Sequence, residues 1–360
     1  MIINCTSALQ SELGQTFPLA VVENPLYSWH GNVRKIGRRK VLILVNDASG
    51  YVIAFYGMKA KDFKNIEDLF WSALNQELAA GHINPEIIEE YANKKQGIVF
   101  SKSQNRALVA KMNTGCKCVE VFEGELDDTT LFQEKICRNI NYDFLVKNGN
   151  GYDYPNKSLL GQLGECFSKP AIRCKAIKVR VKMQLEDFDI WRELIFPLDI
   201  TFNRLHDILQ IAFEWWDYHW HSFTILDKEK AVIQLLEEAD DFDDPLCEVV
   251  KILEGNVKVS EYLPKYKKLI YEYDFGDNWE HVIDVEDVIL DYDKHYAVCL
   301  DGSGDAPPED VGGETGLENF MNIINDPKHE DYEEVKEWGD FVRYMPFDIN
   351  RINNRLEKNY

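Results

Sequence analysis

The chain has 360 residues, and its 45% hydrophobic and 12% aromatic content is enough for two apolar cores and excludes global disorder. The formal net charge is −22, and the acidic excess lies late in the chain: residues 1–118 carry 14 Lys/Arg and 10 Asp/Glu, whereas residues 119–360 carry 26 and 52. An acidic domain repels a phosphate backbone, so direct nucleic-acid binding by the C-terminal domain is not expected. The charge is typical of a solvated surface, a cation site or a surface that faces a basic partner.

The compartment signals favour the cytoplasm. No run of about 18 apolar residues occurs, so the sequence predicts no membrane span. Residues 1–6 lack the basic segment and the apolar core of a signal peptide. The eight cysteines are scattered, with Cys116 and Cys118 as the one close pair, which is typical of reduced thiols in a cytoplasmic protein.

The first domain, residues 1–118, is predicted to combine strands and helices. Residues 41–45 form a fully apolar strand, and residues 51–56 return as a second strand after a turn. An amphipathic helix follows with Asn65 as its N-cap, and another helix begins at Pro85. This part of the chain is therefore expected to be an α+β domain.

Residues 119–170 are predicted to be a connector. The stretch contains an acidic, glycine-containing segment at residues 123–128 and a loop-like run at residues 148–151. Some helix is expected near residues 131–140. The second domain then begins at residue 171 and extends to residue 360.

The second domain opens with the clearest strand in the sequence. Residues 177–185 alternate between apolar and polar side chains, residues 190–196 are the expected antiparallel partner, and Thr201 caps a following helix. Further strands are expected at residues 222–226 and 296–300, and the end of the chain is predicted to be helical. The order of elements indicates a two-domain α+β protein whose second domain is an antiparallel sheet with packed helices.

A hairpin forms the centre of this second domain. Tyr271 and Tyr273 belong to an alternating strand, and the turn-forming residues 276–278 separate it from a second strand that carries Trp279 and His281. The pattern is compatible with a ligand site and equally with a well-bonded turn.

Polar and aromatic residues at the ends of these elements form the candidate site. His219 and His221 are two residues apart, so both rings face the same side of an extended segment. We expect them to converge with the hairpin turn and with residues 309–310 in one cleft. The predicted cleft residues are His219, His221, Asp274, Asp277, Trp279, His281, Glu309 and Asp310.

A divalent metal ion is one candidate occupant of this cleft. The residues that would offer its nitrogen and oxygen ligands are His219, His221, Asp277 and His281. The structural alternative is that neighbouring groups satisfy each histidine ring, that Asp277 only makes a turn, and that Asp310 only braces the glycines after it. Both interpretations stay open, and no catalytic residue is assigned.

Several common catalytic motifs are missing from the sequence. It contains no phosphate-binding loop, no dinucleotide-binding glycine motif at a strand–helix junction, no nucleophile elbow and no zinc-protease helix motif. Whether the protein is an enzyme is therefore left undecided.

The second domain resembles the plasmid pRiA ORF-three-like family over about residues 170–356. The motifs that carry the resemblance are Ile190-Trp191-Arg192, the Leu205-His206 helix, residues 216–223, residues 271–281, residues 307–313 and the Asn350-x-x-Asn353 segment. Trp220 stands where the family usually has Leu, and Ala306 precedes the two prolines where the family often has a small residue or Cys. The resemblance implies an α+β fold and a passenger protein of plasmids or insertion sequences, associated with transposition, but no established reaction. The first domain looks like a bacterial domain of unknown function.

Three functions are compatible with these observations. The favoured one is a cytoplasmic recognition or regulatory module that binds a protein partner or a small ligand through the His/Asp/Trp cleft. The first alternative is a phosphoester hydrolase that uses a divalent ion in the same cleft. The second alternative is an acidic factor that mimics DNA or blocks a protein.

Overall fold

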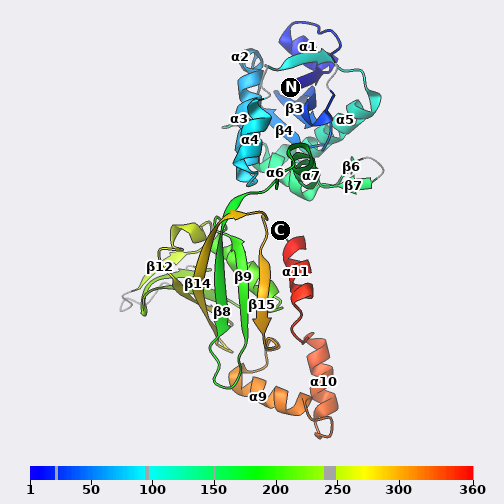
Figure 1. The fold of residues 1–360 in the computed structure, drawn as a ribbon. Helices are drawn as coiled ribbons and strands as arrows, with labels where there is room; N and C mark the ends of the chain where they lie inside the picture. Colours follow the sequence, from blue (N-terminus) through cyan, green and yellow to red (C-terminus); the bar gives the residue numbers. More distant parts are fainter. Residues whose placement is uncertain (21–22, 94–96, 149–150, 239–248, 360) are drawn as a thin grey trace. The chain divides into compact units, whose positions relative to one another are not determined.

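The computed structural model describes residues 1–360 except 21–22, 94–96, 149–150, 239–248 and 360, and these residues divide into two compact units (Figure 1). The first unit is Met1–Arg173 and the second is Cys174–Tyr360. The first carries 20 Lys/Arg and 19 Asp/Glu, whereas the second carries 20 and 43, so the second unit has a net charge of −23. The acidic excess therefore belongs to the second unit.

The first unit is built on a five-stranded sheet with the order β4-β3-β2-β1-β5, in which β1 pairs in parallel with both β2 and β5. Leu42 and Leu44 of β3 pack into one core, and Val41, Ile43 and Val45 pack into another on the opposite face. Burial on both faces explains why this strand is apolar without alternation. The strands are β1 (Ile2–Cys5), β2 (Ser28–Ile36), β3 (Arg39–Asn46), β4 (Val52–Tyr56) and β5 (Val99–Lys102). The helices of the sheet-forming part are α1 (Ser7–Leu13), α2 (Ala60–Lys64), α3 (Ile66–Ala80), α4 (Pro85–Asn93) and α5 (Arg106–Val121).

The expected connector at residues 119–170 is instead part of the first unit. It forms α6 (Glu134–Asp143), the hairpin of β6 (Val146–Asn148) and β7 (Gly151–Asp153), and α7 (Pro155–Phe167). Leu159 and Leu163 of α7 pack into the first unit's core, and Ile136 and Ile140 of α6 cover the other face of the sheet. The loop-forming residues misled the prediction, because the helices on either side of them supply the apolar stripes that the sheet requires.

The second unit is built on an eight-stranded sheet with the order β12-β11-β10-β13-β14-β8-β9-β15. All of its pairings are antiparallel except the one between β11 and β12, which confirms the expected α+β fold with an antiparallel second sheet. The strands are β8 (Cys174–Met183), β9 (Trp191–Pro197), β10 (His221–Asp227), β11 (Lys230–Leu236), β12 (Val250–Leu253), β13 (Lys268–Tyr273), β14 (Trp279–Tyr292) and β15 (Val298–Ser303).

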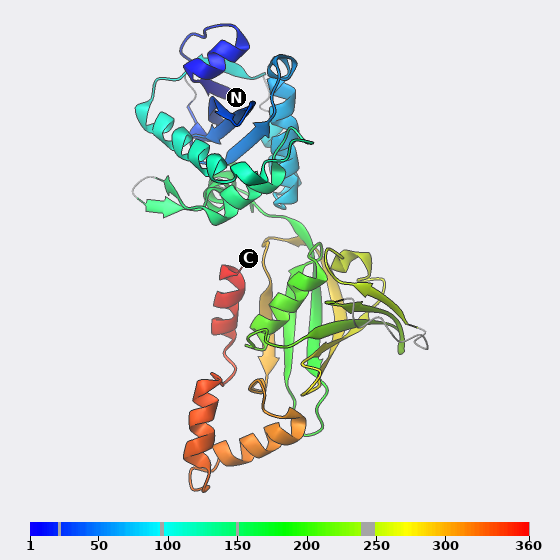
Figure 2. The same cartoon turned by 180° about the vertical axis from the view of Figure 1, so that it is seen from behind.

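Four helices complete the second unit. They are α8 (Phe202–Ala212), α9 (Gly313–Ile324), α10 (Tyr332–Phe341) and α11 (Ile349–Lys358). The side chain of Thr201 accepts the backbone N–H of Arg204 and so starts α8, which lies across one face of the sheet in Figure 2. Its apolar stripe packs with the alternate residues of β8 and β13 in one core, and α11 lies along α8 and β15. Sheet and helices thus hold the ends of β10, β13 and β14 in fixed positions.

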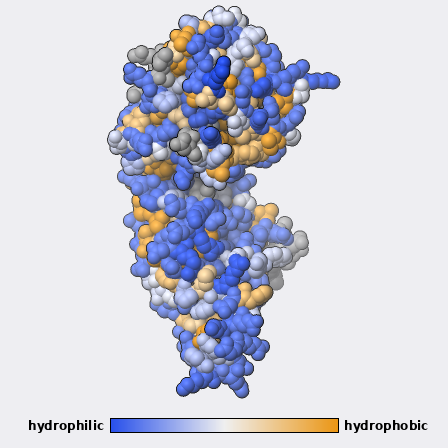
Figure 3. All heavy atoms as spheres, turned by 90° about the vertical axis from the view of Figure 1, so that its right-hand side faces the viewer, coloured by the Kyte–Doolittle hydropathy of each residue, from blue (hydrophilic) through white to orange (hydrophobic). Residues whose placement is uncertain are grey.

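The surface of the second unit is largely polar. Hydrophilic residues cover most of its face in the view of Figure 3. In the part of the chain that the structure describes, no helix combines the length and the hydropathy needed to cross a bilayer.

Candidate functional site

The turn between β13 and β14 presents one free carboxylate oxygen. Asp274 has a left-handed backbone (φ 57°), a conformation that Asp and Asn tolerate better than other side chains. Its Oδ1 accepts the backbone N–H groups of Gly276 at 2.9 Å and Asp277 at 3.3 Å. The local chain therefore fixes the Asp274 carboxylate and leaves Oδ2 for another partner.

His219 faces this free oxygen just before β10 begins. The Asp274 N–H donates to the carbonyl of Trp220 at 3.0 Å, which holds the two segments together. The His219 Nε2 atom lies 3.6 Å from Asp274 Oδ2 and 3.2 Å from Asp310 Oδ1, and the three ligand atoms lie within 4.8 Å of one another. His219 Nε2 is buried and makes no hydrogen bond. We call His219, Asp274 and Asp310 the His219 cluster.

A pocket of about 310 Å³ opens beside this cluster. Two of its aromatic side chains are largely exposed, Tyr218 at 71% and Phe341 at 83%. The guanidinium of Arg343 lies over the Trp216 ring, 4.3 Å from its centroid. The lining residues of this aromatic pocket are Trp216, Tyr218, Glu309, Asp310, Phe341, Val342 and Arg343.

Glu309 places a half-satisfied carboxylate in the wall of the aromatic pocket. Its Oε1 accepts the Tyr273 hydroxyl at 2.7 Å and the Trp216 N–H at 2.9 Å. Its Oε2 has no hydrogen-bond partner, although the residue is only 6% exposed. Burial, together with the neighbouring Glu309 carboxylate, raises the pKa of Tyr273, so this hydroxyl remains a donor. A buried carboxylate oxygen without a partner has capacity for one more donor or cation.

Asp277 joins two loops instead of facing the cluster. Its Oδ2 accepts the Gly312 N–H at 3.0 Å, next to the start of α9. Gly313 has a φ of 69°, and a Cβ there would lie 3.1 Å from the carbonyl oxygen of Asp277. This loop positions Glu309 and Asp310, so Asp277 is a positioning residue and not a wall of the pocket.

His221 belongs to a separate buried pair. Its ring stacks on His206 with centroids 3.6 Å apart, and its Nε2 lies 3.1 Å from Glu254 Oε2. His206 in turn contacts Asp217 and the Tyr271 hydroxyl, both at 2.8 Å. Burial and the neighbouring His221 lower the pKa of His206. His219 and His221 were expected to act together, but His221 contacts His206 and Glu254, whereas His219 contacts Asp274 and Asp310.

Trp279 and His281 lie in the core of the second unit. Trp279 is part of the apolar cluster between sheet and helices. The Nδ1 of His281 faces the backbone carbonyls of Trp279 and Tyr271 at 3.0 and 3.3 Å, and burial lowers its pKa to about 4. Of the four residues in the predicted metal set, the structure places His219 beside the carboxylates of Asp274 and Asp310, whereas His221, Asp277 and His281 each contact other groups.

Sequence reasoning missed several residues of this region. His206 entered the sequence analysis only as part of a motif of the family resemblance, with no contact predicted for it, and Glu254 gave no signal. Phe341 is the last residue of α10 and Arg343 lies in the turn after it, in a part of the chain that nothing in the sequence linked to the hairpin. Their role in the aromatic pocket depends on where α10 ends, which spacing alone does not reveal.

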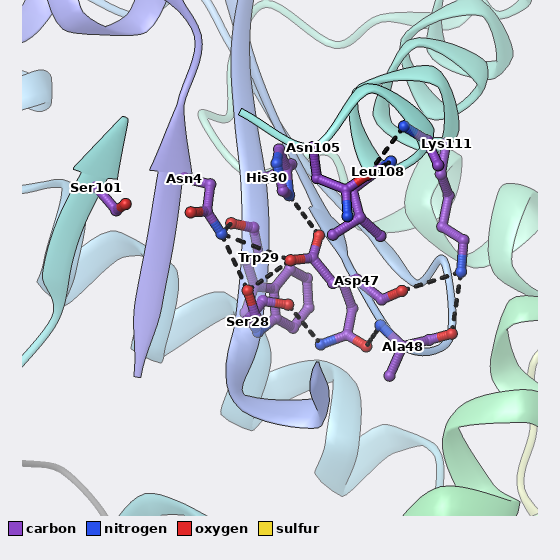
Figure 4. A network of polar contacts seen from close by, with 12 residues as sticks. Asn4, Ser28, Trp29, His30, Asp47, Ala48, Ser101, Asn105, Leu108 and Lys111 are labelled. Carbon is purple, nitrogen blue, oxygen red and sulfur yellow. Dashed lines mark hydrogen bonds and ion pairs between the residues drawn. The ribbon is translucent and has the colours of Figure 1, made fainter. Parts of the chain in front are cut away.

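A second polar cluster lies in the first unit (Figure 4). The carboxylate of Asp47 lies 2.5 Å from the Ser28 hydroxyl, which donates to it, and 2.5 Å from His30 Nδ1. Asn4 donates to Ser28 Oγ at 3.0 Å, and Lys111 donates to the carbonyl of Asp47 at 3.0 Å. Because the serine donates to the aspartate and not to the histidine, this is not a Ser-His-Asp relay. The contacts instead join β1, β2, α5 and the turn after β3.

The two units define a two-domain α+β protein with an acidic C-terminal half. The family model of the plasmid pRiA4b ORF-3-like protein matches residues 175–355, and a domain of unknown function (DUF6933) matches residues 2–158. The chain belongs to the plasmid pRiA4b ORF-3-like family.

One curated relative and one solved structure are each similar to part of this chain. An uncharacterized protein, y4hQ of Sinorhizobium fredii, is 32% identical over 163 residues, which cover 44% of this chain and 79% of the relative. A protein of unknown function from Methanosarcina mazei, MM3350, is 30% identical over 49% of this chain and 96% of its own, with a TM-score of 0.42. Neither name carries an activity.

Proposed function

We propose that the second unit is a recognition module whose aromatic pocket binds a positively charged side chain of a partner, of the arginine or lysine type. The observation that carries the proposal is the carboxylate of Glu309: the residue lines the pocket, and its buried Oε2 lacks a partner. A guanidinium or ammonium group would donate to that oxygen and offset its charge in a poorly solvated position.

The walls of the aromatic pocket suit such a group. Aromatic faces attract cations through the ring quadrupole, and Trp216, Tyr218 and Phe341 offer three of them. Asp310 adds a second carboxylate at the rim, and the net charge of −23 on the unit attracts a basic partner over a longer range. Charge and shape therefore favour the same class of ligand.

Arg343 supports the same conclusion from within the molecule. Its guanidinium lies over Trp216, and it forms no ion pair among the described residues. A guanidinium of the chain itself thus occupies the ring face that the partner's side chain would use. Arg343 would either stack beside the incoming group or give way to it.

The test is a titration with a fluorescein-labelled hexa-arginine peptide, measured by fluorescence anisotropy on the full chain. We expect Glu309→Gln to weaken binding about tenfold, because the amide keeps the Tyr273 contact but removes the charge. Phe341→Ala should weaken binding about threefold, with Leu290→Ala as its control, since Leu290 is also an exposed large hydrophobic residue and lies outside the pocket.

Glu186→Gln is the control for long-range charge, because Glu186 is exposed in the turn between β8 and β9 and is not part of the pocket. If Glu186→Gln and Glu309→Gln weaken the peptide equally, the attraction is general and the pocket proposal is wrong.

A second candidate is metal-dependent phosphoester hydrolysis, favoured by the approach of His219 to two carboxylates. Three protein ligands leave a coordination position for water, as in catalytic metal sites. The test is release of p-nitrophenolate from p-nitrophenyl phosphate with added Zn²⁺, Mn²⁺ or Mg²⁺. Turnover that does not exceed that of Asp274→Asn would remove this candidate.

A further inference from the structure

We infer that His219, Asp274 and Asp310 form a divalent-cation site, and that a cation bound there opposes the binding of a basic side chain in the aromatic pocket. The first statement stands on the His219 cluster alone. The second rests on the proposed function, because Asp310 belongs both to the cluster and to the pocket.

The spacing of the ligand atoms fits a small divalent ion. Metal–ligand bonds of about 2.0–2.1 Å separate two ligand atoms of a tetrahedral site by roughly 3.3 Å. The His219 Nε2 atom lies 3.2 Å from one carboxylate oxygen and 3.6 Å from the other, on either side of that value. Only small side-chain movements are needed to place all three atoms around one ion.

The surrounding contacts hold the ligands in binding orientations. The two N–H groups on Asp274 Oδ1 fix this carboxylate as an outer shell fixes a metal ligand, and they leave Oδ2 towards His219. The Asp310 side chain is 68% exposed, which gives an ion access from solvent. His219 Nε2 is buried and free of hydrogen bonds, so it would not have to break one to coordinate an ion.

The negative charge around the His219 cluster favours a bound cation. Asp274, Glu309 and Asp310 form no ion pair with Lys or Arg within the described ranges of the chain. Glu309, which lines the pocket together with Asp310, has a buried Oε2 without a partner, and this is an independent sign of excess negative charge. One imidazole with two carboxylates suits Zn²⁺ or Mn²⁺ better than Mg²⁺ or Ca²⁺, which prefer oxygen ligands alone.

The shared Asp310 links the two sites. An ion on Asp310 cancels the charge that this residue offers to the pocket and adds positive charge beside it. A basic side chain in the pocket would disfavour the ion by the same factor, because coupling between two binding sites is reciprocal.

Isothermal titration calorimetry of the untagged full chain, stripped with a chelator, tests the site with Zn²⁺, Mn²⁺ and Mg²⁺. We expect one ion per chain, with Zn²⁺ or Mn²⁺ bound more tightly than Mg²⁺. Asp274→Asn and His219→Ala should each weaken binding more than tenfold. Asn at position 274 can keep the left-handed turn and its hydrogen bonds, so loss of binding would not reflect misfolding. The matched control is Asp187→Asn at an exposed turn.

The site is refuted if the wild-type protein binds no ion more tightly than Asp274→Asn does. The linkage is tested by repeating the hexa-arginine titration with saturating ion. The peptide affinity should fall at least threefold in the wild type and stay constant in Asp274→Asn, which keeps Asp310 and the pocket. If the ion binds and the peptide affinity is unchanged, the linkage is wrong. If the peptide fails to bind without ion, the proposed function is wrong, and the calorimetric result on the site is unaffected.

Discussion

Both units place a histidine beside an aspartate, but the two arrangements differ in their exposure to solvent. In the first unit, Asp47 is closed in by Ser28 and His30 within the sheet. In the second unit, Asp274 and Asp310 face His219 at the edge of an open pocket. The comparison teaches that residue types do not separate a structural cluster from a binding site. Exposure does: the His30 and Asp47 side chains are both 3% exposed, whereas Asp310 is 68% exposed.

The largest expected effect is the loss of stability when Asp47 of the buried cluster in the first unit is replaced. Asp47→Ala would leave the Ser28 hydroxyl and the His30 ring buried without their acceptor, so we expect it to destabilise the first unit by about 3–5 kcal/mol. Asp310→Ala removes an exposed carboxylate and should cost less than about 1 kcal/mol. Urea denaturation of both variants measures the difference. Similar losses of unfolding free energy in Asp47→Ala and Asp310→Ala would contradict the distinction between the two clusters.

The stacked pair of His206 and His221 is expected to stabilise the fold, as the Asp47 contacts do in the first unit. His221→Ala would remove the stack on His206 and the partner of the buried Glu254, so it should destabilise the second unit by about 2–4 kcal/mol. Hexa-arginine binding at a temperature where the variant is folded should change less than twofold. The sequence alone had instead placed His221 in the predicted ligand-binding cleft. Strong loss of binding in a stable variant would restore that view.

The buried His281 is expected to make the stability of the second unit depend on pH. Its folded pKa of about 4 lies below its unfolded value of about 6.5, so its stabilising contribution is complete above the unfolded pKa and is lost as the pH falls towards the folded one. Between pH 7 and pH 5 the wild type should lose about 2 kcal/mol more than His281→Gln does. Urea unfolding at both pH values measures this loss. Equal losses in the two proteins would show that His281 titrates as in water.

The smallest effect is expected at Arg343. Arg343→Ala frees the Trp216 face and removes a positive charge from the aromatic pocket, so hexa-arginine should bind two- to fivefold more tightly. The exposed Lys336 of α10 provides the control Lys336→Ala, which removes the same charge outside the pocket. Equal gains in the two variants would mean that only net charge matters. Weaker binding in Arg343→Ala would mean that Arg343 helps to hold the ligand.

The regular part of the fold followed from the sequence because its periodicities are strong. The alternation of β8, the hairpin of β13 and β14, and the Thr201 cap of α8 are local signals, and tertiary packing reinforces them. The stretch at 119–170 was misjudged because its helices are short and its loops dominate the composition. Their burial depends on a distant sheet.

The candidate site was predictable only in outline. Asp274, Glu309 and Asp310 lie at turns, where polar side chains are expected to gather. Which histidine joins them depends on where β10 begins. This strand starts at His221, whose ring lies under α8. His219 belongs to the segment before the strand, where it lies beside Asp310. Spacing of two residues places both rings on one side only if the whole segment is extended, and here it is not.

The most direct measurement of the central claim is a ¹⁵N-indole NMR titration of the eight tryptophans with the hexa-arginine peptide. If the aromatic pocket is the binding site, the Trp216 signal shifts with the peptide, whereas the signals of the buried Trp29 and Trp279 stay in place. The Trp216 shift should require about tenfold more peptide in Glu309→Gln, whereas its titration should be unchanged in Glu186→Gln. Peptide binding without any change at Trp216, or a shift that survives Glu309→Gln unchanged, would contradict the account.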